Sequence, residues 1–393
     1  MDIFCIRGGT PLHGRIALHG AKNAALPLLA ATLATGARCE LLDCPDISDV
    51  TAACAILRHL GCAVEQHGGI VAVDAGSACR SDIPAELMRK MRAAVLFLGP
   101  LLARFGTAEL SLPGGCPIGE RPMDYHLQAF RTLGAEVRQT ERTVFCKASR
   151  LTGARLRLPG PSVGATENAM LAAIGAAGET TIENAAREPE ITDLAGFLCA
   201  CGAKITGAGT SRIRISGGEP LTGATYTVLP DRIETATFLC ACAACGGTLT
   251  LRRAAPQLLQ PVLDALRQSG CQISCGSDTI TVCRHGRLTA CRPVVSEPYP
   301  GFPTDAMPAL LASQLLAEGE TAFTETIFEN RFLHVRQLQK LGADLSQQGR
   351  TVRLRGVPSL HAAQLQADDL RGGAALVIAA MCAEGILRYD VWK

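Results

Sequence analysis

The sequence predicts an α/β or α+β protein built from six similar units that form two compact bodies. An Ala-rich apolar segment of helical length recurs six times at spacings of 66 to 72 residues. The glycines that follow these segments are Gly36, Gly106, Gly178, Gly247, Gly319 and Gly385. A helix–turn–strand signature follows each of the first five segments, with glycines at 61, 134, 202, 270 and 342. Each unit is therefore expected to run strand, helix, strand, helix, strand.

The glycines are expected just past helix ends, where the backbone needs a left-handed residue. The six apolar helices have no polar face, so each must be buried on all sides. Two globular bodies of three units each meet that need better than an open solenoid. The sixth unit shows only its first half before Lys393.

Composition narrows the function class. A formal net charge of +2 over 393 residues gives no general attraction to nucleic acid or anionic lipid, and 16 aromatic side chains offer few stacking platforms. No uncharged apolar run reaches membrane-span length, and the start does not resemble a signal peptide. We therefore expect a cytoplasmic protein. The 18 cysteines indicate packing, including Cys242 and Cys245, whose C-x-x-C spacing lacks the further ligands of a metal site.

The segment from Leu112 to Pro122 holds three glycines and three prolines, so it is predicted to be a loop. Cys116 lies at its middle and Arg121 follows five residues later. A thiol on such a loop beside a positive charge can be held near its ionisation point and used chemically. The alternative is that Cys116 is one more small packing residue. From the residues alone the two remain about equally supported.

Polar residues collect where the apolar helices begin. These entrances hold Lys22 and Asn23, Lys90 to Arg92, Ser162 to Gly164, Asp231 and Arg232, Thr304 and Asp305, and Leu370 and Arg371. Free N–H groups and fixed cations there would suit phosphate or carboxylate groups. The residues alone allow simpler roles: Asp305 as a helix cap with Pro308 in the first turn, which is the favoured interpretation, Ser162 as a cap, and Arg92 as a solvated residue.

Together these features resemble the enolpyruvyl transferases, specifically the branch that acts on UDP-N-acetylglucosamine. The motifs that carry the resemblance are Gly20–Ala25, Leu112–Pro122, Ser162–Thr166, Glu183–Glu190, Leu229–Thr235, Phe302–Asp305, Phe328–Phe332 and Asp369–Arg371. The resemblance implies two inside-out α/β barrels with the active site in the cleft between them. It also implies domains of residues 22–229 and of residues 1–21 with 230–393.

The implied reaction transfers the enolpyruvyl group of phosphoenolpyruvate to the 3′-hydroxyl of UDP-N-acetylglucosamine and releases phosphate. This is the first committed step of peptidoglycan synthesis. No metal or cofactor is implied, and the expected partners are these two small molecules, without nucleic acid or membrane. By resemblance Cys116 is the general acid and the target of fosfomycin, and Asp305 is the base for the sugar hydroxyl. The remaining matching catalytic and substrate positions are Lys22, Asn23, Arg92, Arg121, Pro122, Met123, Asp124, Tyr125, Ser162, Val163, Gly164, Glu190, Arg232, Ile327, Arg331 and Arg371.

The sequence departs from the family pattern after Gly385, where the family continues with an Asp-Arg-Gly-Tyr motif that this chain does not show. One alternative is therefore a catalytically weak or silent paralogue that binds UDP-N-acetylglucosamine, and another is a natural chain that is longer. The sister transferase acting on shikimate 3-phosphate is disfavoured, because the cysteine in the loop is typical of the sugar-nucleotide branch.

Overall fold

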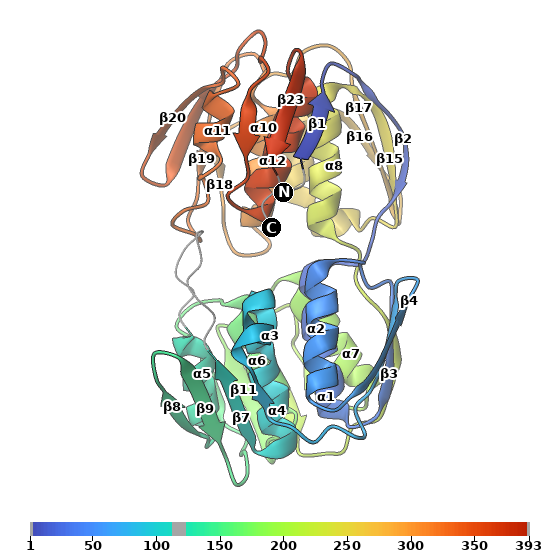
Figure 1. The fold of residues 1–393 in the computed structure, drawn as a ribbon, viewed down its shortest axis with the longest axis vertical. Helices are drawn as coiled ribbons and strands as arrows, with labels where there is room; N and C mark the ends of the chain where they lie inside the picture. Colours follow the sequence, from blue (N-terminus) through green and yellow to red (C-terminus); the bar gives the residue numbers. More distant parts are fainter. Residues whose placement is uncertain (1–2, 112–122, 391–393) are drawn as a thin grey trace. The chain divides into compact units, whose positions relative to one another are not determined.

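The structure is a computed structural model that describes residues 3–111 and 123–390 (Figure 1). The described residues divide into two compact units. The N-terminal unit comprises residues 19–111 and 123–229, and the C-terminal unit comprises residues 3–18 and 230–390. The first strands thus belong with the C-terminal half of the chain, and the chain changes unit between residues 18 and 19 rather than after residue 21.

The N-terminal unit contains three repeats of the predicted pattern. Its helical segments are α1 (Lys22–Thr35), α2 (Ser48–His59), α3 (Ala85–Lys90), η1 (Arg92–Phe97), α4 (Leu98–Phe105), α5 (Asp124–Thr132), α6 (Val163–Ala173) and α7 (Pro189–Ala200). Its strands are β3 (Arg38–Leu42), β4 (Ala63–His67), β5 (Ile70–Asp74), β6 (Asp82–Ile83), β7 (Thr107–Ser111), β8 (Glu136–Gln139), β9 (Thr143–Lys147), β10 (Arg155–Arg157), β11 (Gly178–Glu183), β12 (Lys204–Thr206), β13 (Arg212–Gly217) and β14 (Thr225–Thr227).

The C-terminal unit repeats the same order of elements. Its helical segments are α8 (Arg232–Cys245), η2 (Pro256–Leu258), α9 (Gln260–Gln268), η3 (Thr304–Ala306), α10 (Met307–Ser313), α11 (Val335–Gln339) and α12 (Leu370–Cys382). Its strands are β1 (Ile3–Arg7), β2 (Leu12–Ala17), β15 (Gly247–Arg252), β16 (Gln272–Cys275), β17 (Thr279–Arg284), β18 (Val294–Val295), β19 (Glu320–Thr324), β20 (Asp344–Gln348), β21 (Thr351–Arg355), β22 (Gln364–Gln366) and β23 (Ile386–Asp390).

Five small sheets share one strand order, which confirms the repeat. In β10-β11-β13-β12, for example, the first pair is parallel and the other two are antiparallel. The sheets β14-β3-β5-β4, β6-β7-β9-β8, β2-β15-β17-β16 and β18-β19-β21-β20 follow the same order. In the sixth sheet, the described strands are β22, β23 and β1. Here β1 pairs antiparallel with β23. In the other five sheets, a later strand of the same repeat takes this third position.

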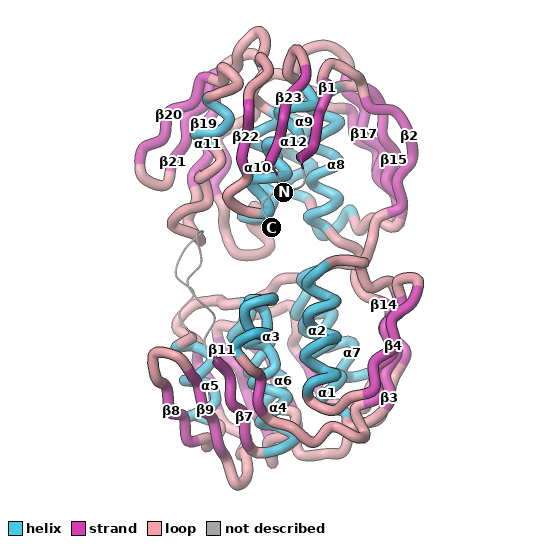
Figure 2. Tube along the Cα trace, in the orientation of Figure 1, coloured by secondary structure: helices cyan, strands magenta, loops and turns pink. Residues whose placement is uncertain are grey.

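Within each unit the apolar helices lie inside and the sheets lie outside (Figures 1 and 2). The central helices α1, α4 and α6 pack on one another in the N-terminal unit, as α8, α10 and α12 do in the C-terminal unit. Helix α1 buries 11 of its 14 residues, because it offers no polar face to water. None of the sheets formed by the described strands closes into a barrel.

All eleven recurring glycines have positive φ angles, as the repeat predicted. Gly36 and Gly106 directly end α1 and α4 with φ of 66° and 67°. The prediction of a position just past the helix end is wrong for Gly178 and Gly319, which lie several residues beyond the ends of α6 and α10. Gly178 and Gly247 begin β11 and β15. A Cβ placed on Gly247 would lie 2.1 Å from the backbone oxygen of Leu12, so close strand pairing also requires glycine there.

Candidate active site

Three helical segments of the C-terminal unit begin at the predicted polar residues. Asp231 precedes α8, and its Oδ1 accepts hydrogen bonds from two backbone N–H groups of the first turn at 2.7 and 3.0 Å. Asp369 precedes α12 and caps it in the same way, at 3.0 Å for both bonds. Thr304 begins η3, which leads into α10 with Pro308 in its first turn. The two caps fix how α8 and α12 present their first side chains.

Asp305 joins two of these entrances. Its Oδ1 accepts a hydrogen bond from Arg331 Nη2 at 2.7 Å, and its Oδ2 accepts one from Arg371 Nη2 at 3.0 Å. The favoured interpretation of Asp305 as a helix cap is wrong, because neither η3 nor α10 has a side-chain cap bond. Both bonds to Asp305 join a guanidinium group to a carboxylate, so they are charge-assisted.

The charges around Asp305 keep it ionised. Burial alone would raise the pKa of Asp305, but Arg371, Arg331 and Arg232 outweigh it and hold that pKa well below its usual range. The side chain of Arg331 is only 2% exposed, so this cation is fixed in place. The predicted residues Arg331 and Arg371 therefore meet at the carboxylate of Asp305, and the charge of Arg232 also acts on it.

Glu325 is a supporting residue that the sequence analysis missed. It is buried, and its carboxylate accepts hydrogen bonds from the hydroxyls of Ser296 at 2.8 Å and Thr304 at 2.7 Å. It also accepts bonds from the backbone N–H groups of Ile327 and Phe328 at 2.7 and 3.1 Å. Glu325 thus holds η3 and the segment containing the predicted residue Ile327, whose side chain is exposed.

His334 and Asp369 are a second buried pair beside this network. Both ring nitrogens of His334 and Oδ2 of Asp369 lack a hydrogen-bond partner within the described residues. A Cβ placed on Gly372 would lie 2.6 Å from Asp369 Oδ2 and 3.0 Å from His334 Cβ, so glycine lets these two side chains approach the start of α12 closely. Burial lowers the pKa of His334 to about 4, against the opposing effect of Asp369. The ring is therefore neutral at pH 7.

In the N-terminal unit, Lys22 is the first residue of α1. Its Nζ donates a hydrogen bond to Asp49 Oδ2 at 2.7 Å, from the first turn of α2. Both side chains are about a quarter exposed, at 28% and 26%. Ion pairs so close to solvent contribute little to stability, which leaves the ammonium group able to exchange partners. Asn23 follows and is exposed.

Helix α6 begins at the predicted polar residue Ser162, which was also expected to be a cap. Ser162 caps the helix, since its Oγ accepts the backbone N–H of Ala165 at 3.4 Å. Val163 and Gly164 form the first turn. A Cβ placed on Gly164 would lie 3.3 Å from Cε1 of His126, so glycine lets this ring pack against the turn.

His126 is a second residue that the sequence analysis missed. Nδ2 of Asn168 donates to the carbonyl oxygen of Val95 at 2.9 Å, while its Oδ1 accepts the N–H of Gly99 at 2.8 Å. These bonds fix the amide orientation, so Nδ1 of His126, 2.8 Å from the same Nδ2, must accept. Burial lowers the pKa of His126 to about 4, which agrees with a neutral ring.

Further predicted residues begin α5 and α7. Met123 lies at the cap position of α5, and Asp124 and Tyr125 form its first turn. Glu190 lies in the first turn of α7 and is buried. Burial, followed by the charges of Glu190 and Glu188, raises the pKa of the fully buried Glu167 well above its usual value. Burial and the neighbouring carboxylates therefore both disfavour the ionised form of Glu167.

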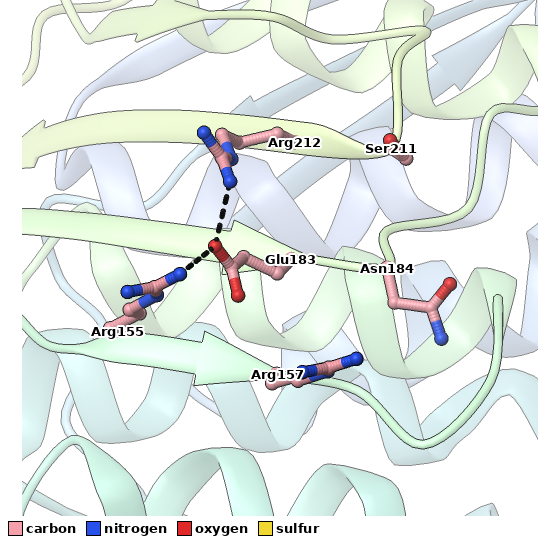
Figure 3. A pocket seen from close by; sticks show the side chains of 6 residues that line it. All are labelled: Arg155, Arg157, Glu183, Asn184, Ser211 and Arg212. Carbon is pink, nitrogen blue, oxygen red and sulfur yellow. Dashed lines mark hydrogen bonds and ion pairs between the residues drawn. The ribbon is translucent and has the colours of Figure 1, made fainter.

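A surface pocket of about 630 Å³ lies where the Glu183–Glu190 motif begins (Figure 3). Glu183 Oε1 accepts hydrogen bonds from Arg155 at 2.7 Å and Arg212 at 3.0 Å, which joins β10, β11 and β13. Asn184 has a φ of 56° and donates from Nδ2 to the carbonyl oxygen of Leu158 at 3.0 Å. These contacts tie the segment leading to Glu190 to the segment leading to Ser162.

Several predicted site residues lie outside the residues that the structure describes. Cys116, Arg121 and Pro122 fall in residues 112–122, which the structure does not describe. The same holds for the side chain of Arg92, whose backbone begins η1. Within residues 3–111 and 123–390, no three His, Cys, Asp or Glu side chains gather closely enough to hold a metal ion. In the same residues no helix has both the length and the apolar character needed to cross a membrane.

Comparison with known proteins identifies the family. The family model described as EPSP synthase (3-phosphoshikimate 1-carboxyvinyltransferase) matches residues 6–392. The chain belongs to this family. This confirms the resemblance to the enolpyruvyl transferases that the motifs indicated.

Relatives and solved structures refine the comparison. UDP-N-acetylglucosamine 1-carboxyvinyltransferase 2 of Caldanaerobacter subterraneus subsp. tengcongensis is 45% identical over 385 residues, which are 98% of this chain and 92% of the relative. UDP-N-acetylglucosamine 1-carboxyvinyltransferase of Halorhodospira halophila is 46% identical over 391 residues, 99% of this chain and 93% of the relative. The crystal structure of the enolpyruvyl transferase NikO from Streptomyces tendae is similar with a TM-score of 0.90 at 27% identity, covering 99% of this chain and 92% of NikO. EPSP synthase from Acinetobacter baumannii, at 20% identity and a TM-score of 0.74 over 99% of this chain and 93% of its own, shares the fold.

Proposed function

We propose that the chain transfers the enolpyruvyl group of phosphoenolpyruvate to the 3′-hydroxyl of UDP-N-acetylglucosamine and releases phosphate. The observation that carries this proposal is the 45–46% identity, over nearly the full chain, to relatives named for this transfer. The ionised Asp305 between Arg331 and Arg371 supports it, because the reaction needs a proton acceptor near cations that bind anionic substrate groups.

The proposed acid–base chemistry uses one residue that donates a proton and one that accepts a proton. Cys116 protonates the enol carbon of phosphoenolpyruvate as the sugar hydroxyl attacks, and Asp305 accepts the proton of that hydroxyl. Paired with two guanidinium groups, Asp305 is a weak base. We infer that phosphate or carboxylate groups of the substrate draw Arg371 away, which raises the basicity of Asp305 when substrate is bound.

The other predicted residues bind the two substrates. Cations hold the phosphate and carboxylate of phosphoenolpyruvate, and helix entrances and loops hold the sugar nucleotide. The proposed phosphoenolpyruvate ligands are Lys22, Arg92, Arg121, Arg331 and Arg371. The proposed sugar-nucleotide ligands are Asn23, Pro122, Met123, Asp124, Tyr125, Ser162, Val163, Gly164, Glu190, Arg232 and Ile327. The proposed chemistry needs no metal or organic cofactor.

The proposed reaction places the chain at the first committed step of peptidoglycan synthesis, in the cytoplasm. The assignment also predicts inactivation by fosfomycin, because an epoxide alkylates a reactive thiolate at Cys116.

Phosphate release from the two substrates tests the proposal. We expect release that depends on UDP-N-acetylglucosamine, falls at least about 100-fold in Cys116→Ala, and falls in Asp305→Asn. Cys199→Ala is the matched control, because Cys199 is an exposed thiol in the N-terminal unit outside the proposed site. Binding of UDP-N-acetylglucosamine without phosphate release by the folded wild-type chain would refute the proposal in favour of a binding paralogue.

A further inference from the structure

Two cysteines meet at the C-terminal ends of the central helices α8 and α12. The Sγ atoms of Cys245 and Cys382 are 3.6 Å apart, although the residues are 137 positions apart in the sequence. Both residues are partly exposed, whereas most of the described cysteines are buried. A reagent can therefore reach this pair from solvent.

The two sulfurs are chemically unequal. A hydrogen bond from Cys382 lowers the pKa of Cys245, and the charge of Arg284 lowers it further. The same hydrogen bond, with burial, raises the pKa of Cys382. Arg284 is held in place because its Nε and Nη2 donate to the carbonyl oxygens of Ala243 and Ala244 at 2.9 and 2.6 Å. Cys245 is thus the more easily ionised thiol of the pair.

We propose that Cys245 and Cys382 are a site of reversible oxidation, at which a hydroperoxide converts the two thiols into a disulfide. The Cys245 thiolate attacks one peroxide oxygen, so an S–O bond forms, the O–O bond breaks and hydroxide leaves. Cys382 then loses its proton and attacks the sulfur of the sulfenic acid. The S–S bond forms and the S–O bond breaks, and the proton of Cys382 leaves with the departing hydroxide as water. The first hydroxide takes up the proton that Cys245 released on ionising, so two waters result for each hydrogen peroxide consumed.

The geometry favours this pair over the neighbouring thiols. A disulfide needs the sulfurs to approach by only about 1.5 Å, to about 2.05 Å. Cys242 is fully buried and its thiol donates to the carbonyl oxygen of Val282 at 3.8 Å. Cys39 and Cys201 also interact, but their exposed fractions are only 1% and 0%, so peroxide cannot easily reach them.

The bridge would join helix ends remote from Asp305. A helix of 13 or 14 residues is about 20 Å long, and Arg232 and Arg371 lie at the opposite ends of α8 and α12. The disulfide would also close a long loop of the C-terminal unit, which restricts the unfolded chain. We therefore expect oxidation to raise the midpoint of thermal unfolding of that unit.

Peptide mapping of the full chain after hydrogen peroxide treatment tests the proposal. We expect one cross-linked peptide pair containing Cys245 and Cys382, two hydrogens lighter than the separate peptides and released by dithiothreitol. In Cys382→Ser, Cys245 should instead form a sulfenic acid that dimedone traps. Cys283→Ser is the matched control, because Cys283 is also partly exposed and its loss should leave the bridge intact.

The peptide map of the wild-type chain tests the proposal even if a variant fails to fold. A bridge between Cys39 and Cys201, or between Cys245 and any cysteine other than Cys382, would overturn the proposal. The proposal would also be overturned if the thiols of Cys245 and Cys382 could still be fully alkylated at peroxide concentrations that oxidise the exposed Cys199.

Discussion

Replacing Arg331 with methionine should strongly destabilise the C-terminal unit. Arg331 is 2% exposed, and it donates to Asp305 at 2.7 Å and to the hydroxyl of Thr304 at 3.1 Å. Its guanidinium carbon also lies 4.8 Å from the centre of the Phe328 ring. Methionine keeps the apolar bulk and removes only the charge and the donors.

The expected loss can be worked from these contacts. Removing one partner of a buried ion pair costs about 3–5 kcal/mol, because the other charge is left without compensation. Asp305 keeps Arg371 as a partner and its side chain is 24% exposed, which favours the lower end, about 3 kcal/mol. For a unit of this size that corresponds to a fall of roughly 6–12 °C in the unfolding midpoint.

Differential scanning calorimetry measures this change, with Arg350→Met as the matched control. Arg350 pairs with Glu329 at 2.9 Å in the same unit, but both side chains are about half exposed. An exposed pair contributes at most about 1 kcal/mol. If Arg331→Met melted within about 1 kcal/mol of the wild type, as the control should, the buried network would not hold the unit together.

Three further changes test other parts of the account. Ser162→Ala removes the cap of α6 and should cost about 1 kcal/mol in urea unfolding, with Ser162→Thr close to wild type. Glu325→Gln should cost about 2 kcal/mol and weaken phosphoenolpyruvate binding, because a buried carboxylate that accepts four hydrogen bonds becomes a group with two donors; unchanged unfolding and KM would contradict this. The pKa of His126 is lowered to about 4 in the folded chain, against about 6.5 in the unfolded chain. Its contribution to the free energy of unfolding is therefore complete above pH 6.5 and is lost as the pH falls toward 4. The loss is on the order of 2 kcal/mol between pH 7 and pH 5, and His126→Gln should flatten that part of the pH–stability profile.

The repeat made most of the fold predictable. The glycine spacing and the apolar helices indicated six units in two bodies, and the structure shows six sheets around two groups of buried helices. The apolar character of the helices predicted that they are buried, whereas the barrel-like arrangement of the sheets around them came from the resemblance.

The site was only partly predictable from the residues. Periodicity located Lys22, Ser162, Arg232 and Arg371 at helix entrances, but it could not pair Asp305 with Arg331, which lies outside any entrance. That pairing is a tertiary contact, and only the resemblance suggested a joint role.

The residues that the sequence analysis missed share one property. Glu325, His126 and His334 are buried polar residues whose importance depends on hydrogen bonds or spaces formed by distant parts of the chain. A single sequence carries no local signal for such contacts. The Thr-Glu-Thr run around Glu325 could be recognised only after η3 and β19 were seen together.

The most direct test of the central claim is to identify the product by mass spectrometry. The purified chain is given phosphoenolpyruvate with either UDP-N-acetylglucosamine or shikimate 3-phosphate, since the family model is described by the second reaction and the relatives are named for the first. We predict that UDP-N-acetylglucosamine gains one enolpyruvyl group and that shikimate 3-phosphate stays unchanged. Enolpyruvyl transfer to shikimate 3-phosphate, or to neither acceptor, would contradict the proposed function.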